Sequence, residues 1–148
     1  MDTNCILLVE DSQDDIDLTL RAFRKNNILN KIVVLRDGAE ALDFIFCRGA
    51  HAERDKQEPI AVIFLDLKLP KVSGLEVLRQ LRMDPHFQYV PVIVLTSSRE
   101  EQDRISSYCL GANSYVQKPV DFERFTNAAR QLGLYWLVLN EPPPKLAQ

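Results

Sequence analysis

The sequence predicts an α/β protein in which a five-stranded parallel sheet is covered by helices on both faces. Two observations carry this prediction. Five short apolar runs alternate along the chain with segments of helical periodicity, which is typical of a doubly wound sheet with right-handed crossovers. The runs are apolar throughout, as expected for strands buried on both faces. The 148 residues are enough for one domain.

Each strand is expected where apolar and β-branched residues run together. The predicted strands are Cys5–Val9, Lys31–Leu35, Ala61–Leu65, Pro91–Leu95 and Ser114–Gln117, of which the last is the weakest. Four helices are expected between them, because apolar residues there share one helical face. These sets are Ile16, Leu20 and Phe23; Leu42, Ile45 and Phe46; Leu75, Leu78 and Leu81; and Ile105, Tyr108 and Cys109.

A longer apolar stripe follows the fifth predicted strand. It runs through Phe122, Phe125, Ala129, Leu132, Trp136 and Leu139, which corresponds to about five helical turns. Three prolines at 142–144 then end it. We therefore expect an extended final helix, one domain over residues 1–140, and a proline-containing tail over residues 141–148.

Composition excludes several function classes. The formal net charge is −3, which gives no electrostatic footprint for nucleic acid. No apolar run is long enough to span a membrane, and the N-terminus lacks the features of a signal peptide. Cys5, Cys47 and Cys109 lie far apart and form no C-x-x-C pair. We expect reduced thiols and a cytoplasmic protein.

Polar side chains gather where the predicted strands end. Glu10 and Asp11 follow the first strand, Asp66 the third and Lys118 the fifth, while Thr96 follows the fourth. Because sites in such sheets form beyond the carboxyl ends of the strands, these residues should meet in one crevice. Neighbouring carboxylates repel by about 4 kcal/mol per pair at 4 Å and an effective dielectric near 20. An acidic all-oxygen site of this kind suits Mg²⁺.

Helix capping is the competing explanation for the acidic residues. Several of them could simply face the positive N-terminus of the first helix, namely Asp11, Asp14 and Asp15 together with Ser12. Capping explains neither Asp66 nor Lys118. A reactive role explains both, because a carboxylate that attacks phosphorus gives an acyl phosphate. Lys118 would neutralise one phosphoryl oxygen and the Thr96 hydroxyl would bind another.

These motifs resemble the receiver domain of two-component response regulators. The matching segments are Ile6–Asp11, Leu65–Pro70 with Gly74, Val94–Ser97, and Tyr115 with Lys118 and Pro119. The resemblance covers about residues 4–135. It implies a flavodoxin-like receiver fold with strand order 2-1-3-4-5. One variation is the Glu10-Asp11 pair, where many receivers carry two aspartates.

The same resemblance implies a role for each site residue. Asp66 would be the phosphoacceptor and Lys118 the phosphate-bound lysine. Thr96 and Tyr115 would be the switch pair. Mg²⁺ (or Mn²⁺) would be held by Asp11, Asp66 and the main-chain carbonyl of Lys68, with Glu10 acting through water.

A narrower resemblance is to the small stand-alone response regulators that pair with cyanobacterial phytochromes. It rests on the loop Gly49–Pro59, the segment His86–Pro91 and the tail Leu134–Leu137. It implies a sensor histidine kinase as partner, expected to be a phytochrome. No enzyme activity is expected beyond the protein's own phosphorylation and dephosphorylation. Only 30 residues follow Lys118, so we expect output by contact with a downstream protein that the sequence does not identify.

The end of the last helix predicts a homodimer, built on the fourth predicted helix, the fifth predicted strand and the final helix. Consecutive residues step about 100° around a helix axis, so a run of large apolar residues cannot all face one domain. The exposed members would form an interface, with Tyr135, Trp136, Leu137 and Leu139 as its residues. The alternative is that this segment folds back over its own domain.

Two other functions compete with that of a response regulator. A phosphohydrolase of the haloacid-dehalogenase type also uses an aspartate nucleophile and Mg²⁺. It needs a second aspartate two positions later as acid and base, and Lys68 stands there. A receiver-like interaction module without phosphotransfer would lack one of the key groups, whereas this chain retains Asp66, Thr96 and Lys118.

Overall fold

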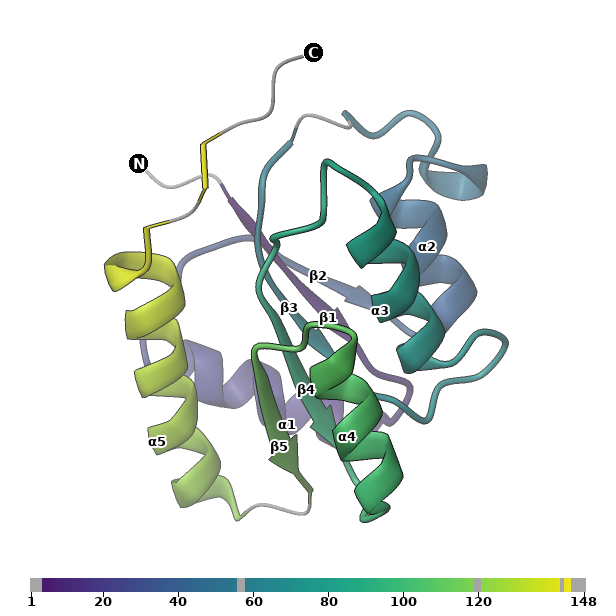
Figure 1. The fold of residues 1–148 in the computed structure, drawn as a ribbon. Helices are drawn as coiled ribbons and strands as arrows, with labels where there is room; N and C mark the ends of the chain where they lie inside the picture. The colour runs from purple at the N-terminus through teal and green to yellow at the C-terminus, as the bar shows by residue number, and fades with distance from the viewer. Residues whose placement is uncertain (1–3, 56–57, 119–120, 142, 145–148) are drawn as a thin grey trace.

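A computed structural model describes residues 4–55, 58–118, 121–141 and 143–144, and a five-stranded sheet lies at its centre (Figure 1). The strands are β1 (Cys5–Val9), β2 (Ile32–Leu35), β3 (Ile60–Leu65), β4 (Val92–Thr96) and β5 (Ser114–Gln117). They lie in the order β2-β1-β3-β4-β5, and every pairing is parallel. The predicted fold class and strand order are confirmed, with strand ends that differ from the prediction by at most one residue.

Helices cover both faces of the sheet (Figure 1). On one side lie α1 (Gln13–Lys25) and α5 (Phe122–Gly133), and on the other lie α2 (Gly38–Ile45), α3 (Gly74–Met83) and α4 (Glu101–Cys109). Four of these helices begin at a side chain that accepts a hydrogen bond from a backbone N–H of the first turn, and the capping residues are Ser12, Asp37, Ser73 and Asp121. A short 3₁₀ helix, η1 (Gly49–His51), lies in the long loop before β3.

The core forms two layers because successive strand residues point to opposite faces. Leu7, Ile63 and Val94 pack on the side of α2 and α3. Their neighbours Ile6 and Val62 pack with α1 and α5. Both layers are closed to solvent, so the strand ends are held rigidly where the polar residues follow.

The chain after α5 departs from the predicted helix. Residues Leu134–Leu139 form a π-helical segment, η2, in which the Asn140 N–H donates to the Tyr135 carbonyl at 2.6 Å. A π-helical turn joins residues five positions apart rather than four, so the apolar stripe does not continue on one face. Trp136 and Leu137 are half-buried and pack against the core layer shared by α1 and α5.

This packing bears on the predicted interface, which remains a prediction. Trp136 and Leu137 pack partly against their own domain, and each stays partly exposed. The structure describes the side chains of three predicted interface residues, namely Tyr135, Trp136 and Leu137. Of these, Tyr135 is the most exposed, and its ring lies edge-on to that of Trp136. The side chain of Leu139 lies outside the described residues.

Two features expected from composition can be compared with the structure. Within the described ranges, no helix combines the length and apolar character that crossing a membrane requires.

Cys5 is buried, Cys47 half-buried and Cys109 exposed, and all three are free thiols. Burial raises the pKa of the Cys5 thiol, which makes it a packing group rather than a nucleophile.

Gly74 carries the first testable prediction, because α3 begins against the loop that follows β3. A Cβ at this position would lie 2.1 Å from the Asp66 carbonyl oxygen and 2.7 Å from Leu67 Cα. Both are backbone atoms, so the loop would have to move. We expect Gly74→Ala to lower the free energy of unfolding by about 1–3 kcal/mol. Urea denaturation measures this loss.

A matched control is Arg79→Ala, an exposed position in the same helix. It should change the free energy of unfolding by no more than about 0.5 kcal/mol. A Gly74→Ala protein as stable as this control would contradict the close packing of α3 on the loop.

Candidate functional site

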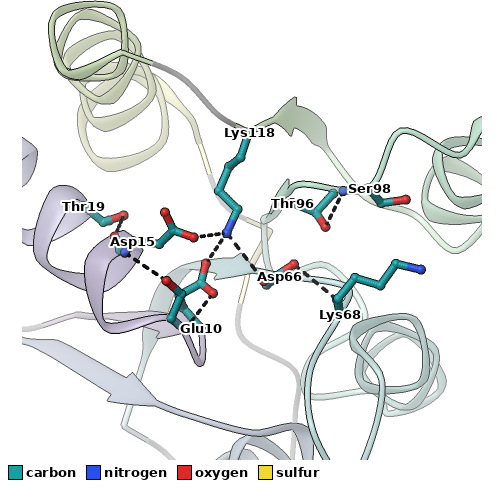
Figure 2. A network of polar contacts seen from close by, with 9 residues as sticks. Glu10, Asp15, Thr19, Asp66, Lys68, Thr96, Ser98 and Lys118 are labelled. Carbon is teal, nitrogen blue, oxygen red and sulfur yellow. Dashed lines mark hydrogen bonds and ion pairs between the residues drawn. The ribbon is translucent and has the colours of Figure 1, made fainter.

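The polar residues predicted at the strand ends meet at one edge of the sheet (Figure 2). Their exposed fractions are 2% for Glu10, 5% for Asp66, 0% for Thr96 and 8% for Lys118. Backbone hydrogen bonds extend the sheet by one residue at each of these ends. The Asp66 N–H donates to the Val9 carbonyl at 3.0 Å, and the Lys118 N–H donates to the Thr96 carbonyl at 2.7 Å. The backbone therefore fixes where these side chains start.

Three carboxylates form a cluster that could hold a cation. Oxygens of Glu10, Asp11 and Asp66 lie within 4.8 Å of one another, and of the three residues only Asp11 is exposed. Carboxylate oxygens at this spacing fit a divalent cation that keeps part of its water shell. The Lys68 N–H donates to Asp66 Oδ1 at 3.2 Å, so the loop after β3 turns back over the Asp66 carboxylate. The ligand role of the Lys68 carbonyl remains a prediction.

Lys118 supplies the positive charge in this cluster (Figure 2). Its Nζ lies 2.7 Å from Glu10 Oε1, 2.6 Å from Asp15 Oδ2 and 3.5 Å from Asp66 Oδ2. Burial alone would lower the pKa of Lys118, but the hydrogen bonds to Asp15 and Glu10 outweigh it and hold that pKa above its ordinary value. The side chain is therefore a permanent ammonium group.

Glu10 is the carboxylate most affected by its surroundings. Burial raises the pKa of Glu10 from 4.5 to about 7, against the hydrogen bond from Lys118 and with help from the charge of Asp66. Three acidic side chains contact a single ammonium here. The native site thus retains a proton on Glu10 at a pH where an unfolded chain has lost it.

This shift predicts how stability depends on pH without a metal. The native state binds more protons than the unfolded state between pH 4.5 and about 7, so the free energy of unfolding falls as pH rises through that window. The fall attributable to Glu10 is on the order of 3 kcal/mol. In the presence of a chelator, Glu10→Gln should remove it, measured by urea denaturation at several pH values.

The control for this experiment is Glu101→Gln, an exposed glutamate at the start of α4. Its stability profile should run parallel to that of the parent protein. If Glu10→Gln also ran parallel to the parent, the raised pKa would be wrong.

The predicted switch pair does not meet directly in this structure. Thr96 Oγ1 accepts a hydrogen bond from the Ser98 N–H at 3.3 Å, and the Tyr115 hydroxyl donates to the Ser98 carbonyl at 3.4 Å. Tyr115 is half-buried, with its ring 6.5 Å from that of Tyr108. The backbone of Ser98 therefore connects the buried hydroxyl beside Asp66 to the ring at the edge of the sheet.

The Lys68 side chain reaches across to α4. Its Nζ lies 3.4 Å from Asp103 Oδ2 and 3.9 Å from Glu100 Oε1. Asp103 also accepts a hydrogen bond from Ser98 Oγ at 2.6 Å. The loop that carries Asp66 is thus joined to the first turn of α4 through charged side chains, an arrangement that the sequence patterns did not predict.

Asp15 is the functional-site residue that sequence reasoning missed. It was interpreted only as a charge near the N-terminus of the first helix, yet it makes the shortest contact with Lys118. No periodic pattern singles it out, because α1 begins only at Gln13 and an acidic side chain in the first turn is equally well explained by the helix N-terminus.

Residues 6–130 match the family model described as response regulator receiver domain. The chain belongs to the response regulator receiver family. The predicted resemblance to the family is therefore confirmed, while the roles of Asp66, Thr96 and Lys118 remain predictions.

Receiver proteins similar to this chain include phytochrome regulators. FilR2 of Methanothrix harundinacea, described as a probable methanogenesis regulatory protein, is 38% identical over 93% of this chain and 86% of its own. The phosphorylated cyanobacterial phytochrome response regulator RcpA is 32% identical, with a TM-score of 0.86 over 97% of this chain and 100% of RcpA. The bacteriophytochrome response regulator RtBRR is 51% identical, with a TM-score of 0.78 over 97% of this chain and 86% of RtBRR.

These similarities bear on the competing functions. All three relatives are described as regulators, and the family match covers most of this chain. A phosphohydrolase of the haloacid-dehalogenase type is not favoured. A receiver-like module that never carries a phosphoryl group is not favoured either, since this chain keeps the acidic residues, the hydroxyl and the lysine.

Proposed function

We propose that this receiver accepts a phosphoryl group from a sensor histidine kinase on Asp66 and signals through protein contacts. The observation that carries the proposal is the position of Asp66. Its carboxylate is 5% exposed, lies 3.5 Å from the Lys118 ammonium, and shares an acidic cluster with Glu10 and Asp11. A carboxylate beside a fixed ammonium and a cation site is suited to attack on phosphorus.

The transfer would conserve atoms and charge as follows. An Asp66 carboxylate oxygen attacks the phosphorus of a phosphohistidine, a bond forms between oxygen and phosphorus, and the bond from phosphorus to nitrogen breaks. The electron pair of that bond stays on the imidazole of the kinase. Lys118 would neutralise one phosphoryl oxygen, and the Thr96 hydroxyl would donate to another.

The donor set fits Mg²⁺ or Mn²⁺ in the predicted place. Asp11, Asp66 and the Lys68 carbonyl would hold the ion, and Glu10 would act through water. When bound, the ion would supply positive charge between the carboxylates and the incoming phosphoryl group. The chain's own contribution is to hold three carboxylates within reach of one another despite their repulsion.

The switch would run from Thr96 through Ser98 to Tyr115. If Thr96 turns to donate to a phosphoryl oxygen, its Oγ1 leaves the Ser98 N–H that it now accepts from. Ser98 is also bonded to Tyr115 and Asp103. The support for this path is that one small residue contacts all three groups.

We propose a phytochrome-type histidine kinase as the donor. The likenesses to RcpA and RtBRR support this choice, and both come from phytochrome systems. The protein would act in the cytoplasm, where its free thiols are stable. It would catalyse no reaction other than its own phosphorylation and dephosphorylation, and its downstream partner would be a protein.

Phosphotransfer from a purified phytochrome kinase tests this function. The kinase is first labelled on its histidine, and then the receiver is added in excess. We expect label to leave the kinase and appear on the receiver, and a chelator to stop the transfer. Label that stays on the kinase while a known partner regulator accepts it would contradict the proposal.

Homodimerisation remains a proposal, as does the division into residues 1–140 and a tail at 141–148. Exposed apolar side chains support a dimer. They are Tyr135, which is 50% exposed, and Tyr108 and Ile105 of α4, with exposed fractions of 51% and 49%. Sedimentation equilibrium decides the question, and Tyr135→Ala should weaken any dimer. A monomer at every concentration would contradict it.

A further inference from the structure

The Lys118 ammonium is not centred on the proposed phosphoacceptor. Its Nζ lies 2.6 Å from Asp15 and 2.7 Å from Glu10, and both distances are those of hydrogen bonds. The distance to Asp66 is 3.5 Å, which is an ion pair but not a hydrogen bond. Figure 2 shows the same asymmetry, with Lys118 reaching down between the α1 side of the site and Asp66. Something on the α1 side holds the ammonium there.

Asp15 is well placed to do this because α1 fixes its backbone. The Ser12 Oγ accepts from the Asp15 N–H at 3.4 Å, and the Thr19 hydroxyl donates to the Asp15 carbonyl at 2.8 Å. Neither bond uses the Asp15 side chain, whose carboxylate is free to contact Lys118. That side chain is 33% exposed, whereas Glu10 is 2% exposed. Asp15 can therefore be changed without emptying a buried space.

We propose that Asp15 is a positioning residue that draws the Lys118 ammonium away from Asp66 in the unphosphorylated protein. The proposal rests on the function proposed above, because it concerns what Lys118 must do once Asp66 carries a phosphoryl group. An ammonium has three N–H donors. Two are used by Asp15 and Glu10, which leaves one. Because Lys118 Nζ lies 3.5 Å from Asp66 Oδ2, the ammonium must move toward Asp66, and so away from the Asp15 carboxylate, before it can donate fully to a phosphoryl group there.

The consequence is that Asp15 disfavours the phosphorylated state. Contact between Lys118 and a phosphoryl oxygen requires the charge-assisted hydrogen bond to Asp15 to weaken or break. Asp15→Asn removes the charge but preserves the size and shape of the side chain. We expect the variant to bind a phosphoryl analogue about tenfold more tightly than the parent, as expected when one such bond no longer opposes binding.

The control variants are set by α1 itself. Asp14→Asn makes the same change of charge one residue away, on an exposed side chain in the same first turn. It should bind the analogue as the parent does. Asp15→Glu keeps the negative charge at position 15 and should return the affinity toward the parent value. Asp14→Asn is the variant that excludes a general effect of charge in the first turn.

Two measurements test the proposal. The first is titration with beryllium fluoride in saturating Mg²⁺, for the parent and the three variants. The second needs no metal: a crystal structure of Asp15→Asn prepared with a chelator should show Lys118 Nζ within hydrogen-bond distance of Asp66. Equal beryllium fluoride affinities for Asp15→Asn and Asp14→Asn would overturn the proposal, and so would an unmoved Lys118.

Failure of the proposed function gives a different result. In that case the parent protein itself does not bind beryllium fluoride, or binds it equally well as Asp66→Asn. The position of Lys118 in the metal-free variant still decides whether Asp15 holds the ammonium back.

Discussion

Asp66→Asn should abolish phosphorylation of this receiver. The expected result is one phosphoryl group per chain for the parent protein, and no label on the variant, from either a phytochrome kinase or acetyl phosphate. An amide offers no carboxylate electron pair for attack on phosphorus, so an acyl phosphate cannot form. The substitution is nearly isosteric at a site that is 5% exposed, so the fold should be preserved.

A second substitution separates the nucleophile from the cation site. Asp11→Asn leaves Asp66 in place but removes an exposed member of the acidic cluster. It should slow labelling and raise the Mg²⁺ concentration that labelling needs, without preventing it.

Persistent full labelling of Asp66→Asn would show that another group is the acceptor. Circular dichroism of both variants checks that each is folded.

Lys118→Ala should produce the largest loss of stability among the site variants. The ammonium contacts two almost fully buried carboxylates, Glu10 and Asp66, and the partly exposed Asp15. Removing one partner of a buried ion pair leaves uncompensated charge, which destabilises by about 3–5 kcal/mol. The loss should be measured by urea denaturation in a chelator at alkaline pH, where Glu10 is ionised in the native state.

Two conditions should reduce that loss. Lowering the pH lets Glu10 take up a proton, and more readily than in the parent, because Lys118 no longer lowers the pKa of Glu10. Added Mg²⁺ replaces part of the missing charge. The matched control is Lys31→Ala, whose ion pair with Glu58 is 4.0 Å long and lies at an exposed lysine. It should cost no more than about 1 kcal/mol. Equal losses for the two lysines would contradict the importance of burial.

The parts of the site that sequence predicts are those encoded next to a strand. Asp66 and Thr96 lie at the ends of strands whose apolar runs are plain in the sequence. Parallel strands end at one edge, so the fold class alone brings these residues together. The same reasoning placed Lys118 there, although 108 residues separate it from Glu10.

The parts that sequence does not predict depend on rotation and helical period. Asp15 contacts Lys118 only because α1 turns that residue toward the sheet edge, and a charge in a first turn is equally well explained by capping. Trp136 and Leu137 face inward because η2 is wound as a π helix, which no apolar pattern specifies. Lys68 pairs with Asp103 across a distance set by the tertiary fold.

The late position of Lys118 in the chain has a consequence for biosynthesis. Glu10 and Asp66 are made early, but the ammonium that compensates them comes from the strand added last to the sheet. A nascent chain that ends before residue 118 would bury two carboxylates without their partner, so we expect it to stay open on the ribosome. Arrested chains ending just before and well beyond that point should differ sharply in protease resistance. In that case a kinase could not transfer its phosphoryl group to an incomplete receiver, because the site around Asp66 would form only once the final strand had been added.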